Sequence, residues 1–555
     1  MKNLRDNIPT IVFWSAAALL SLWALGQRGL WGAEDRWAEI PREMLLTRDF
    51  FHPCINGEPY FDKPLLGYWL IALVATLTGR LDEWVVRLPS AIAGLLALGA
   101  TINLGRRLWS QQMGRTAGWL LLSSYGYLFW ARTGEADMAN MAAIILAVAW
   151  YWSRRDKPGF FSYLVFYFIC FIGAQNKGLA AIVVPVIVVL PDLIRQSRWK
   201  SYLSWPHFAA LALAVVVYFA PFAYSEITRS GYRAGGLWMV FHENVVRYFH
   251  PFDHVEPFYV YFYYLPRLFL PWTPLLLMAL WGAFASLKKL DWPSKWLTLA
   301  TALIFVFFTV SGSRRSYYIL PILPFCSLMA AICFALAKEE KWRRLVVNIQ
   351  TGLIVPVMAV AILSPVFWPV LKHRLEFTAP KALVFGTPLL GFVAMACFIM
   401  GRWRPALVAQ VTGASRELAP LIAMSVIMMG GFFCWQYNAF SEYDSMKNFS
   451  MELKRKTPGL KPDEIAFFRK IPVKTLFYLD LPGPVLLLQD RDSVRAFLNS
   501  DCQRKVLVSH DNYLDELAKV LPAEMVGRAT LKEKIYPWEK NEKKYRAWII
   551  KRTAN

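Results

Sequence analysis

Two stretches near the start of the chain place carboxylates and cations close to aromatic residues. The first, LWGAEDRWAEIPREML (30–45), contains the adjacent acids Glu34 and Asp35, and the second, YFDKPLLGYW (60–69), contains Lys63. A carboxylate can take a proton from an incoming hydroxyl group, and a lysine can hold a phosphate. The same residues could instead pair with one another on a solvated amphipathic helix, so their surroundings decide between the two interpretations.

The composition of the chain is typical of a membrane protein. Hydrophobic residues make up 56% of the 555 residues and charged residues only 18%, below the roughly 25% of soluble domains. Apolar runs of about 18 residues or more recur between Ile11 and Trp435, and each is long enough to cross a bilayer as a helix. A soluble protein would need many core helices without a polar face. We therefore expect a polytopic α-helical membrane protein.

The net charge of +22 lies mostly in short loops between the apolar runs. Because cytoplasmic loops of membrane proteins are rich in lysine and arginine, these loops, together with Lys2 and Arg5, are predicted to lie in the cytoplasm. Such a distribution does not indicate a nucleic-acid partner. The predicted cytoplasmic loops carry Arg106, Arg107 and Arg115; Arg154, Arg155 and Lys157; Arg195, Arg198 and Lys200; Lys288, Lys289 and Lys295; Lys338, Lys341, Arg343 and Arg344; and Arg402, Arg404 and Arg416.

The basic loops set the order of the membrane crossings. No small-residue cleavage site follows the first apolar run, so we expect a retained first helix rather than a signal peptide. The short run at 65–79 must lie along the membrane surface if the loop at Arg106 is to be cytoplasmic again. The count comes to about thirteen transmembrane helices, which leaves the C-terminal tail outside the cytoplasm. The helices are expected near 9–27, 84–105, 115–131, 138–153, 160–175, 178–194, 203–224, 258–285, 295–311, 316–337, 345–368, 382–402 and 417–436.

The tail differs in composition from the rest of the chain, because charged residues occur throughout it. Its short apolar runs resemble strands and alternate with helix-like stretches, which predicts a small α/β domain. It has no glycine-rich phosphate-binding loop, so we expect no nucleotide site. The strand-like runs are 475–479, 485–488 and 505–508, and the helix-like stretches are 492–498 and 513–520. The predicted domains are a transmembrane domain, 1–440, with outer loops 28–83 and 225–257, and an extracytoplasmic α/β domain, 441–555.

Four further polar motifs fall on the outer face in this topology. Ionisable residues beside membrane helices are costly, and by default they mark functional sites. The motifs are RTGEADM (132–138), NKG (176–178), VFHENVVRY (240–248) and SRRSYYILP (313–321).

With these motifs, the chain resembles bacterial aminoarabinose transferases and the related protein mannosyltransferases, which share the GT-C fold. The resemblance covers essentially the whole chain and implies about thirteen membrane helices and a periplasmic C-terminal domain in the bacterial inner membrane. One position departs from the family. Relatives typically read D-E-x-R-Y-A-E-I, whereas Ala33 stands at the first acid here, Glu34 at the second and Asp35 at the variable position.

The resemblance implies a glycosyltransferase that moves a sugar from a polyprenyl-phosphate donor to lipid A or another lipid or glycan acceptor of the cell envelope, at the periplasmic face. Protein O-mannosylation is the alternative within the superfamily. A transporter or flippase is the alternative from another class, but such proteins usually carry their ionisable residues near the middle of the membrane. A scaffold that displays the C-terminal domain is a third possibility.

The resemblance also implies roles for individual residues. Glu34 or Asp35, with Asp137 nearby, would act as general base, and Glu34 is favoured because it keeps the family register. If the acceptor is a phosphate, the carboxylate would only orient the substrates. The predicted donor-phosphate ligands are Lys63 and Arg247, with Lys177, Arg314, Arg315 and Tyr318 as helpers. The predicted substrate groove contains Arg36, Tyr60, Asp62, Tyr68, His242 and Glu243.

The sequence requires no cofactor. The spacing of its histidines and cysteines matches no standard zinc pattern. His242 and Glu243 would be the ligands if a divalent ion bound. The expected partners are thus the lipid-linked donor, the acceptor and the membrane lipids.

Overall fold

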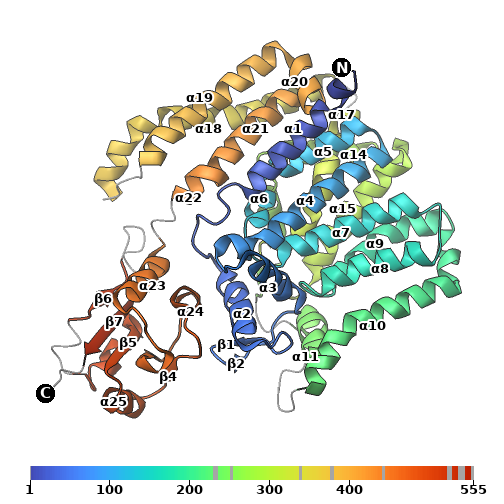
Figure 1. Cartoon of the computed structure of the whole chain (residues 1–555). Helices are drawn as coiled ribbons and strands as arrows, with labels where there is room; N and C mark the ends of the chain where they lie inside the picture. Colours follow the sequence, from blue (N-terminus) through green and yellow to red (C-terminus); the bar gives the residue numbers. More distant parts are fainter. Residues whose placement is uncertain are drawn as a thin grey trace.

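The computed structural model is a helical bundle with a small α/β unit at one end (Figure 1). The residues that it describes are 2–228, 236–250, 254–336, 340–375, 381–439, 444–521, 528–534 and 544–551. Lys338, parts of the predicted outer loop 225–257 and the expected domain boundary at 440–441 lie outside the described residues.

The bundle helices match the apolar runs of the sequence closely. Six of them are long and apolar enough to cross a membrane, or seven if the bent pair α13 and α14 is one span, within the described ranges. The protein is therefore a multi-pass membrane protein, and the count of thirteen crossings stays a prediction. The bundle helices are α1 Lys2–Leu22, α4 Glu83–Leu108, α5 Gln111–Leu122, α6 Tyr125–Ala131, α7 Asp137–Arg154, α8 Phe160–Ala174, α9 Ala180–Arg195, α10 Trp205–Thr228, α13 Val260–Leu268, α14 Thr273–Ala285, α15 Trp292–Val310, α16 Leu323–Ala331, α17 Cys333–Leu336, α18 Glu340–Leu375, α19 Lys381–Trp403, α20 Pro405–Thr412, α21 Ala419–Gly431 and α22 Tyr437–Ala439.

Several of the predicted helices are broken. The run at 258–285 is two helices, α13 and α14, with a bend of 119° between them. Pro271 and Pro274 lie at the break, where a proline cannot donate the backbone hydrogen bond that a continuous helix needs. The expected helix at 115–131 is likewise divided into α5 and α6 at Ser123 and Ser124.

The first predicted outer loop is folded, and it packs on the bundle end that faces away from the N-terminus (Figure 1). Trp37, Ile40 and Met44 form the buried face of its helix α2. The stretch at 65–79 forms α3, as expected, and α3 packs against α2. The elements of this end are α2 Glu34–Thr47, the hairpin β1 Cys54–Ile55 and β2 Glu58–Pro59, α3 Leu66–Thr78, α11 Gly236–Phe241 and α12 Arg247–Phe249.

The C-terminal strands form one five-stranded sheet in the order β4-β3-β5-β7-β6. The pairs β3–β4 and β3–β5 are parallel, whereas β7 runs antiparallel to β5 and β6. Helices α23 and α24 share a hydrophobic core with one face of the sheet, and α25 and α26 with the other. The elements are α23 Ser445–Lys456, β3 Ile465–Phe468, α24 Val473–Leu479, β4 Leu486–Leu488, α25 Arg491–Asn499, β5 Arg504–His510, α26 Leu514–Leu517, β6 Leu531–Lys532 and β7 Tyr545–Lys551.

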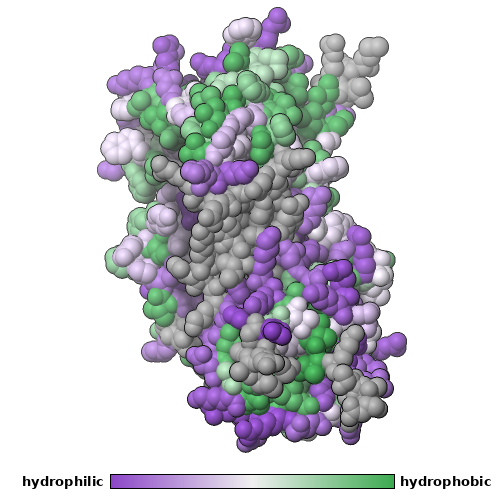
Figure 2. Space-filling model, turned by 90° about the vertical axis from the view of Figure 1, so that its left-hand side faces the viewer, coloured by the Kyte–Doolittle hydropathy of each residue, from purple (hydrophilic) through white to green (hydrophobic). Residues whose placement is uncertain are grey.

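This unit corrects one of the predicted strands. The run at 475–479 is part of helix α24, because its apolar side chains Leu476 and Leu479 pack into the sheet core from a helix face. The other two predicted strands are confirmed as β4 and β5. In the view of Figure 2, hydrophobic side chains gather over the upper part of the molecule, and hydrophilic ones prevail over the lower part, where this unit lies.

Candidate active site

Three cations from distant parts of the chain line one cavity of about 390 Å³, here called the cation cavity. Lys63 lies in the loop before α3, Lys177 lies between α8 and α9, and Arg247 begins α12. The structure thus brings together three of the five cations that the sequence assigned to phosphate binding. Tyr318, another predicted phosphate ligand, also lines the cavity.

Carboxylates hold these cations in place. Glu243 accepts hydrogen bonds from both Lys63 (3.3 Å) and Arg247, so the two cations lie side by side. Lys177 forms an ion pair with Asp137, and its ammonium group lies 4.7 Å from the centre of the Tyr318 ring. Burial lowers the pKa of Lys177, although the charge of Asp137 opposes this shift.

The backbone between α8 and α9 approaches the cavity closely because of a glycine. Gly178 has a φ of +139°, and a Cβ there would lie 2.2 Å from Oδ1 of Asn244. The same oxygen accepts a hydrogen bond of 2.7 Å from the Leu179 N–H. The NKG motif therefore places Lys177 in the cavity by joining the start of α9 to the segment that carries Arg247.

One wall of the cation cavity is apolar. Leu179, Val183, Phe249, Phe307 and Phe308 line it. Phe249 exposes 68% of its surface and Val183 38%, so this wall continues to the outside of the bundle. A ligand with an anionic group and an attached hydrocarbon chain matches both sides of the cavity.

Four of the predicted groove residues form a polar network beside the cation cavity. Arg36 donates hydrogen bonds to Tyr60 (2.5 Å) and Asp62 (2.7 Å), and Tyr68 donates to the other oxygen of Asp62 (3.3 Å). The backbone carbonyl of Asp62 accepts a bond of 2.8 Å from Lys63. This network fixes the direction of the lysine.

Glu34 does not have the geometry of a general base. Its side chain is fully buried, and its two oxygens accept hydrogen bonds from Arg87, Arg28, the Trp31 N–H and the Gly134 N–H. Burial raises the pKa of this carboxyl, but the guanidinium groups and the Gly134 N–H outweigh it and lower the pKa to about 2. The assignment of Glu34 as the base therefore does not fit the structure.

The other two predicted acids differ from Glu34 in their surroundings. Asp35 accepts a hydrogen bond of 2.8 Å from the N–H of Arg36, and burial raises the pKa of its carboxyl. Asp137 is buried and paired with Lys177. Asp137 thus contacts one cation of the cation cavity without lining the cavity itself, and neither Glu34 nor Asp35 lines it.

A further carboxylate, which the site assignments omitted, lies close to Asp137 in the sequence. Glu135, two residues before Asp137, lines a second cavity of about 480 Å³ whose walls are otherwise mostly apolar. Burial first, and then the charges of Asp137 and Glu34, raise the pKa of Glu135. The RTGEADM motif contained this residue, but nothing in the sequence distinguished it from its neighbours.

Arg314, Arg315 and His242 do not line the cation cavity. Arg314 donates to the backbone carbonyls of Glu256 (2.7 Å) and Ser311, and Arg315 donates to Tyr317 (2.8 Å). The two arginines therefore support the loop that carries Tyr318, and their contact with the donor phosphate stays a prediction.

A divalent ion at His242 and Glu243, which the sequence allowed but did not require, has no further support. Nδ1 of His242 lies 3.9 Å from Oε1 of Glu243. A metal site normally needs at least three protein ligands. Within the described ranges, no group of three or more His, Cys, Asp or Glu side chains could hold an ion.

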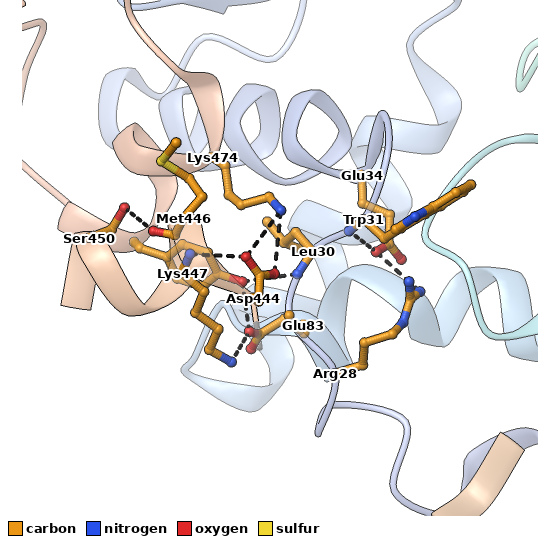
Figure 3. A network of polar contacts seen from close by, with 12 residues as sticks. Arg28, Leu30, Trp31, Glu34, Glu83, Asp444, Met446, Lys447, Ser450 and Lys474 are labelled. Atoms are coloured by element: carbon orange, nitrogen blue, oxygen red, sulfur yellow. Dashed lines mark hydrogen bonds and ion pairs between the residues drawn. The ribbon is translucent and has the colours of Figure 1, made fainter. Parts of the chain in front are cut away.

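The C-terminal unit contacts the first outer loop directly (Figure 3). Tyr478 of α24 accepts a hydrogen bond from the Leu30 N–H (3.0 Å) and donates one to Glu83 (2.9 Å). Lys447 of α23 forms an ion pair with the same Glu83. These bonds anchor the loop that ends in Glu34.

Comparisons with known proteins agree with this geometry. Residues 62–224 match the dolichyl-phosphate-mannose-protein mannosyltransferase family. An undecaprenyl phosphate-α-4-amino-4-deoxy-L-arabinose arabinosyl transferase of Pseudomonas aeruginosa (strain UCBPP-PA14) is 32% identical over 57% of this chain and 57% of its own length. The chain thus spans little more than half the length of that relative.

A second relative is matched over more of its length. The corresponding arabinosyl transferase 2 of Sodalis glossinidius is 30% identical over 71% of each chain. The crystal structure of ArnT from Cupriavidus metallidurans bound to undecaprenyl phosphate has the same fold, with a TM-score of 0.73 over 97% of both chains at 18% identity. The chain belongs to the aminoarabinose transferase-like family of glycosyltransferases with the GT-C fold.

Proposed function

We propose that the protein transfers a sugar from a polyprenyl-phosphate donor to lipid A or another cell-envelope acceptor at the periplasmic face of the inner membrane. The observation that carries this proposal is the cation cavity, which places Lys63, Lys177 and Arg247 next to an open apolar wall. The relatives of this protein in Pseudomonas and Sodalis are arabinosyl transferases named for an undecaprenyl-phosphate aminoarabinose.

Lys63 and Arg247 hold the donor phosphate in this proposal. The bond between the sugar and the phosphate breaks during transfer, and the polyprenyl phosphate that leaves gains negative charge. Cations already fixed by Glu243 stabilise that charge without having to reorganise. Lys177 and Tyr318, which also line the cavity, add to this binding, and the apolar wall accommodates the first units of the polyprenyl chain.

The topology belongs to the same proposal. The N-terminus lies at one end of the bundle, whereas α2, α3 and the C-terminal sheet lie at the other (Figure 1). This arrangement supports a cytoplasmic N-terminus, a transmembrane domain over 1–440 and a periplasmic domain over 441–555. An odd number of crossings, such as thirteen, follows from that orientation.

The nature of the second cavity favours a lipid acceptor. Its lining includes Leu70, Ile71, Ile92 and Leu96, and an acyl chain matches such a surface better than a polar peptide does. The match of residues 62–224 to a protein mannosyltransferase family keeps a protein acceptor as the second candidate. Membership of a transferase family argues against a transporter and against a scaffold.

Transfer assays with the purified full chain test the proposal. The protein is incubated in detergent with undecaprenyl-phosphate aminoarabinose or undecaprenyl-phosphate mannose, each with lipid A or with a serine- and threonine-rich peptide. We expect a new glycolipid by mass spectrometry and no glycopeptide. A glycopeptide without a glycolipid would support the second candidate, and intact donor in every mixture would contradict both.

A further inference from the structure

Among the described residues, Glu135 differs from the other buried acids of the outer end because no protein group forms a hydrogen bond or a close ion pair with its carboxylate. The residue exposes only 9% of its surface. Its backbone is fixed, since its N–H donates to Thr133 (2.9 Å) and its carbonyl accepts from Ser90 (3.0 Å). In the part of the chain that the structure describes, no hydrogen bond or ion pair to its side chain is found.

The neighbouring acids show how unusual this is. Glu34 is paired with Arg87, Asp137 with Lys177 and Glu243 with Arg247. A buried carboxylate without a partner is expensive, and proteins rarely keep one without a use for it. Glu135 therefore makes no close polar contact that holds the fold together, and a substrate group is the partner that its position leaves room for.

Glu135 lies where the two cavities approach each other. Its side chain lines the apolar cavity together with Asn176, while the next residue, Lys177, lines the cation cavity. Asn140, one helical turn after Ala136, also lines the cation cavity. The segment around Glu135 and the NKG turn thus form the partition across which donor and acceptor would have to meet.

The first outer loop reaches the same carboxylate. A Cβ on Gly32 would lie 3.7 Å from Oε1 of Glu135. Glu34 bonds the N–H of Gly134 at 2.7 Å, directly before Glu135. Glu34, which is itself held by Arg87, therefore helps to position the backbone next to Glu135.

We propose that Glu135 is the general base of the transfer to an acceptor hydroxyl. The inference rests on the proposed function. The Glu135 carboxylate takes the proton of the acceptor hydroxyl as the acceptor oxygen bonds to the anomeric carbon. The bond from that carbon to the phosphate oxygen breaks, and polyprenyl phosphate leaves with the electron pair. The carboxylic acid then returns its proton to water.

The raised pKa of Glu135 suits this role. A base works best when its pKa lies near the working pH, where it is deprotonated and still accepts a proton readily. Because the folded pKa is raised, the base form is lost as the pH falls, beginning above the ordinary titration range of glutamate. Activity should therefore fall on the acidic side at a higher pH than for an exposed glutamate.

The test compares Glu135→Gln with wild-type protein and with Glu58→Gln, an exposed residue of the β1–β2 hairpin. Glutamine keeps the shape of the side chain and should not disturb folding, since the carboxylate forms no hydrogen bond or ion pair with the residues that the structure describes. We expect kcat to fall by roughly 10²–10⁴-fold with the affinity for undecaprenyl phosphate unchanged. The residual activity should no longer fall at acidic pH, and Glu58→Gln should match the wild type.

Each other outcome contradicts a specific claim. Full turnover of Glu135→Gln with the wild-type pH profile overturns the role of Glu135 while leaving the proposed function intact. Weaker binding of undecaprenyl phosphate at unchanged kcat would make Glu135 part of the donor site instead of the base. A wild-type protein that transfers no sugar from any polyprenyl-phosphate donor would overturn the proposed function, and the assignment of Glu135 with it.

Discussion

The first outer loop and the cation cavity both gather acids and bases, but they use them differently. Glu34 and Arg87 expose 0% and 1% of their side chains, and fixed partners surround both. Lys63 and Glu243 expose 23% and 17% and face a cavity. The family motif alone therefore does not identify which acids and bases can contact a substrate. Charges that are completely enclosed hold the site together, and charges that border space are available to a ligand.

The largest expected effect is on the enclosed pair. Glu34→Gln leaves the buried Arg87 guanidinium without its counter-charge, and breaking a buried pair in this way typically costs about 3–5 kcal/mol. We expect a marked fall in the unfolding temperature in detergent. Glu58→Gln on the exposed hairpin is the control. A Glu34→Gln protein with normal stability and lost turnover would restore Glu34 as a candidate base.

Substitutions in the cation cavity should affect stability less than Glu34→Gln does, and they should mainly reduce turnover. Lys63→Ala and Arg247→Ala each remove a charge-assisted contact to phosphate, so turnover should fall by at least roughly tenfold. Stability should change little, because Glu243 keeps one of its two cationic partners. Arg106→Ala, at an exposed position at the end of α4, serves as the matched control. Normal turnover of both cavity variants would remove the phosphate assignment.

The smallest effect is expected where the C-terminal unit supports the first loop. Tyr478→Phe keeps the ring but removes the hydroxyl that contacts Leu30 and Glu83, which should cost about 1 kcal/mol of stability. Turnover should fall only a few-fold, since the Lys447–Glu83 ion pair remains. Thermal unfolding and transfer rates of Tyr478→Phe measure the two effects. A loss of turnover as large as for Lys63→Ala would place the C-terminal unit in the catalytic site itself.

The sequence predicted the parts of the fold that depend on local patterns. Apolar runs identified bundle helices such as α10 and α19, and the alternating composition of the tail identified β4 and β5. Prediction from the sequence failed where an element depends on contacts with residues far away in the chain, or where an apolar run is short. The run at 475–479 is as apolar as a strand, and only packing against the sheet core makes it a helix.

The candidate site likewise has features that local motifs predict and features that depend on distant contacts. Motifs beside membrane helices singled out Lys63, Lys177 and Arg247, which line one cavity in the structure, because ionisable residues in such positions are costly. The burial of Glu34 could not be predicted, since its partner Arg87 lies 53 residues away. Glu135 was missed for the opposite reason, because a sequence does not show which carboxylate lacks a partner.

Binding of undecaprenyl phosphate to the wild-type protein and to the double variant Lys63→Ala/Arg247→Ala tests the central claim most directly. The claim is that the cation cavity recognises the phosphate of a lipid carrier. We expect the wild type to bind undecaprenyl phosphate but not the uncharged alcohol undecaprenol, and the double variant to lose this preference. Equal binding of the two lipids by the wild type, or an unchanged affinity of the double variant for undecaprenyl phosphate, would contradict the account.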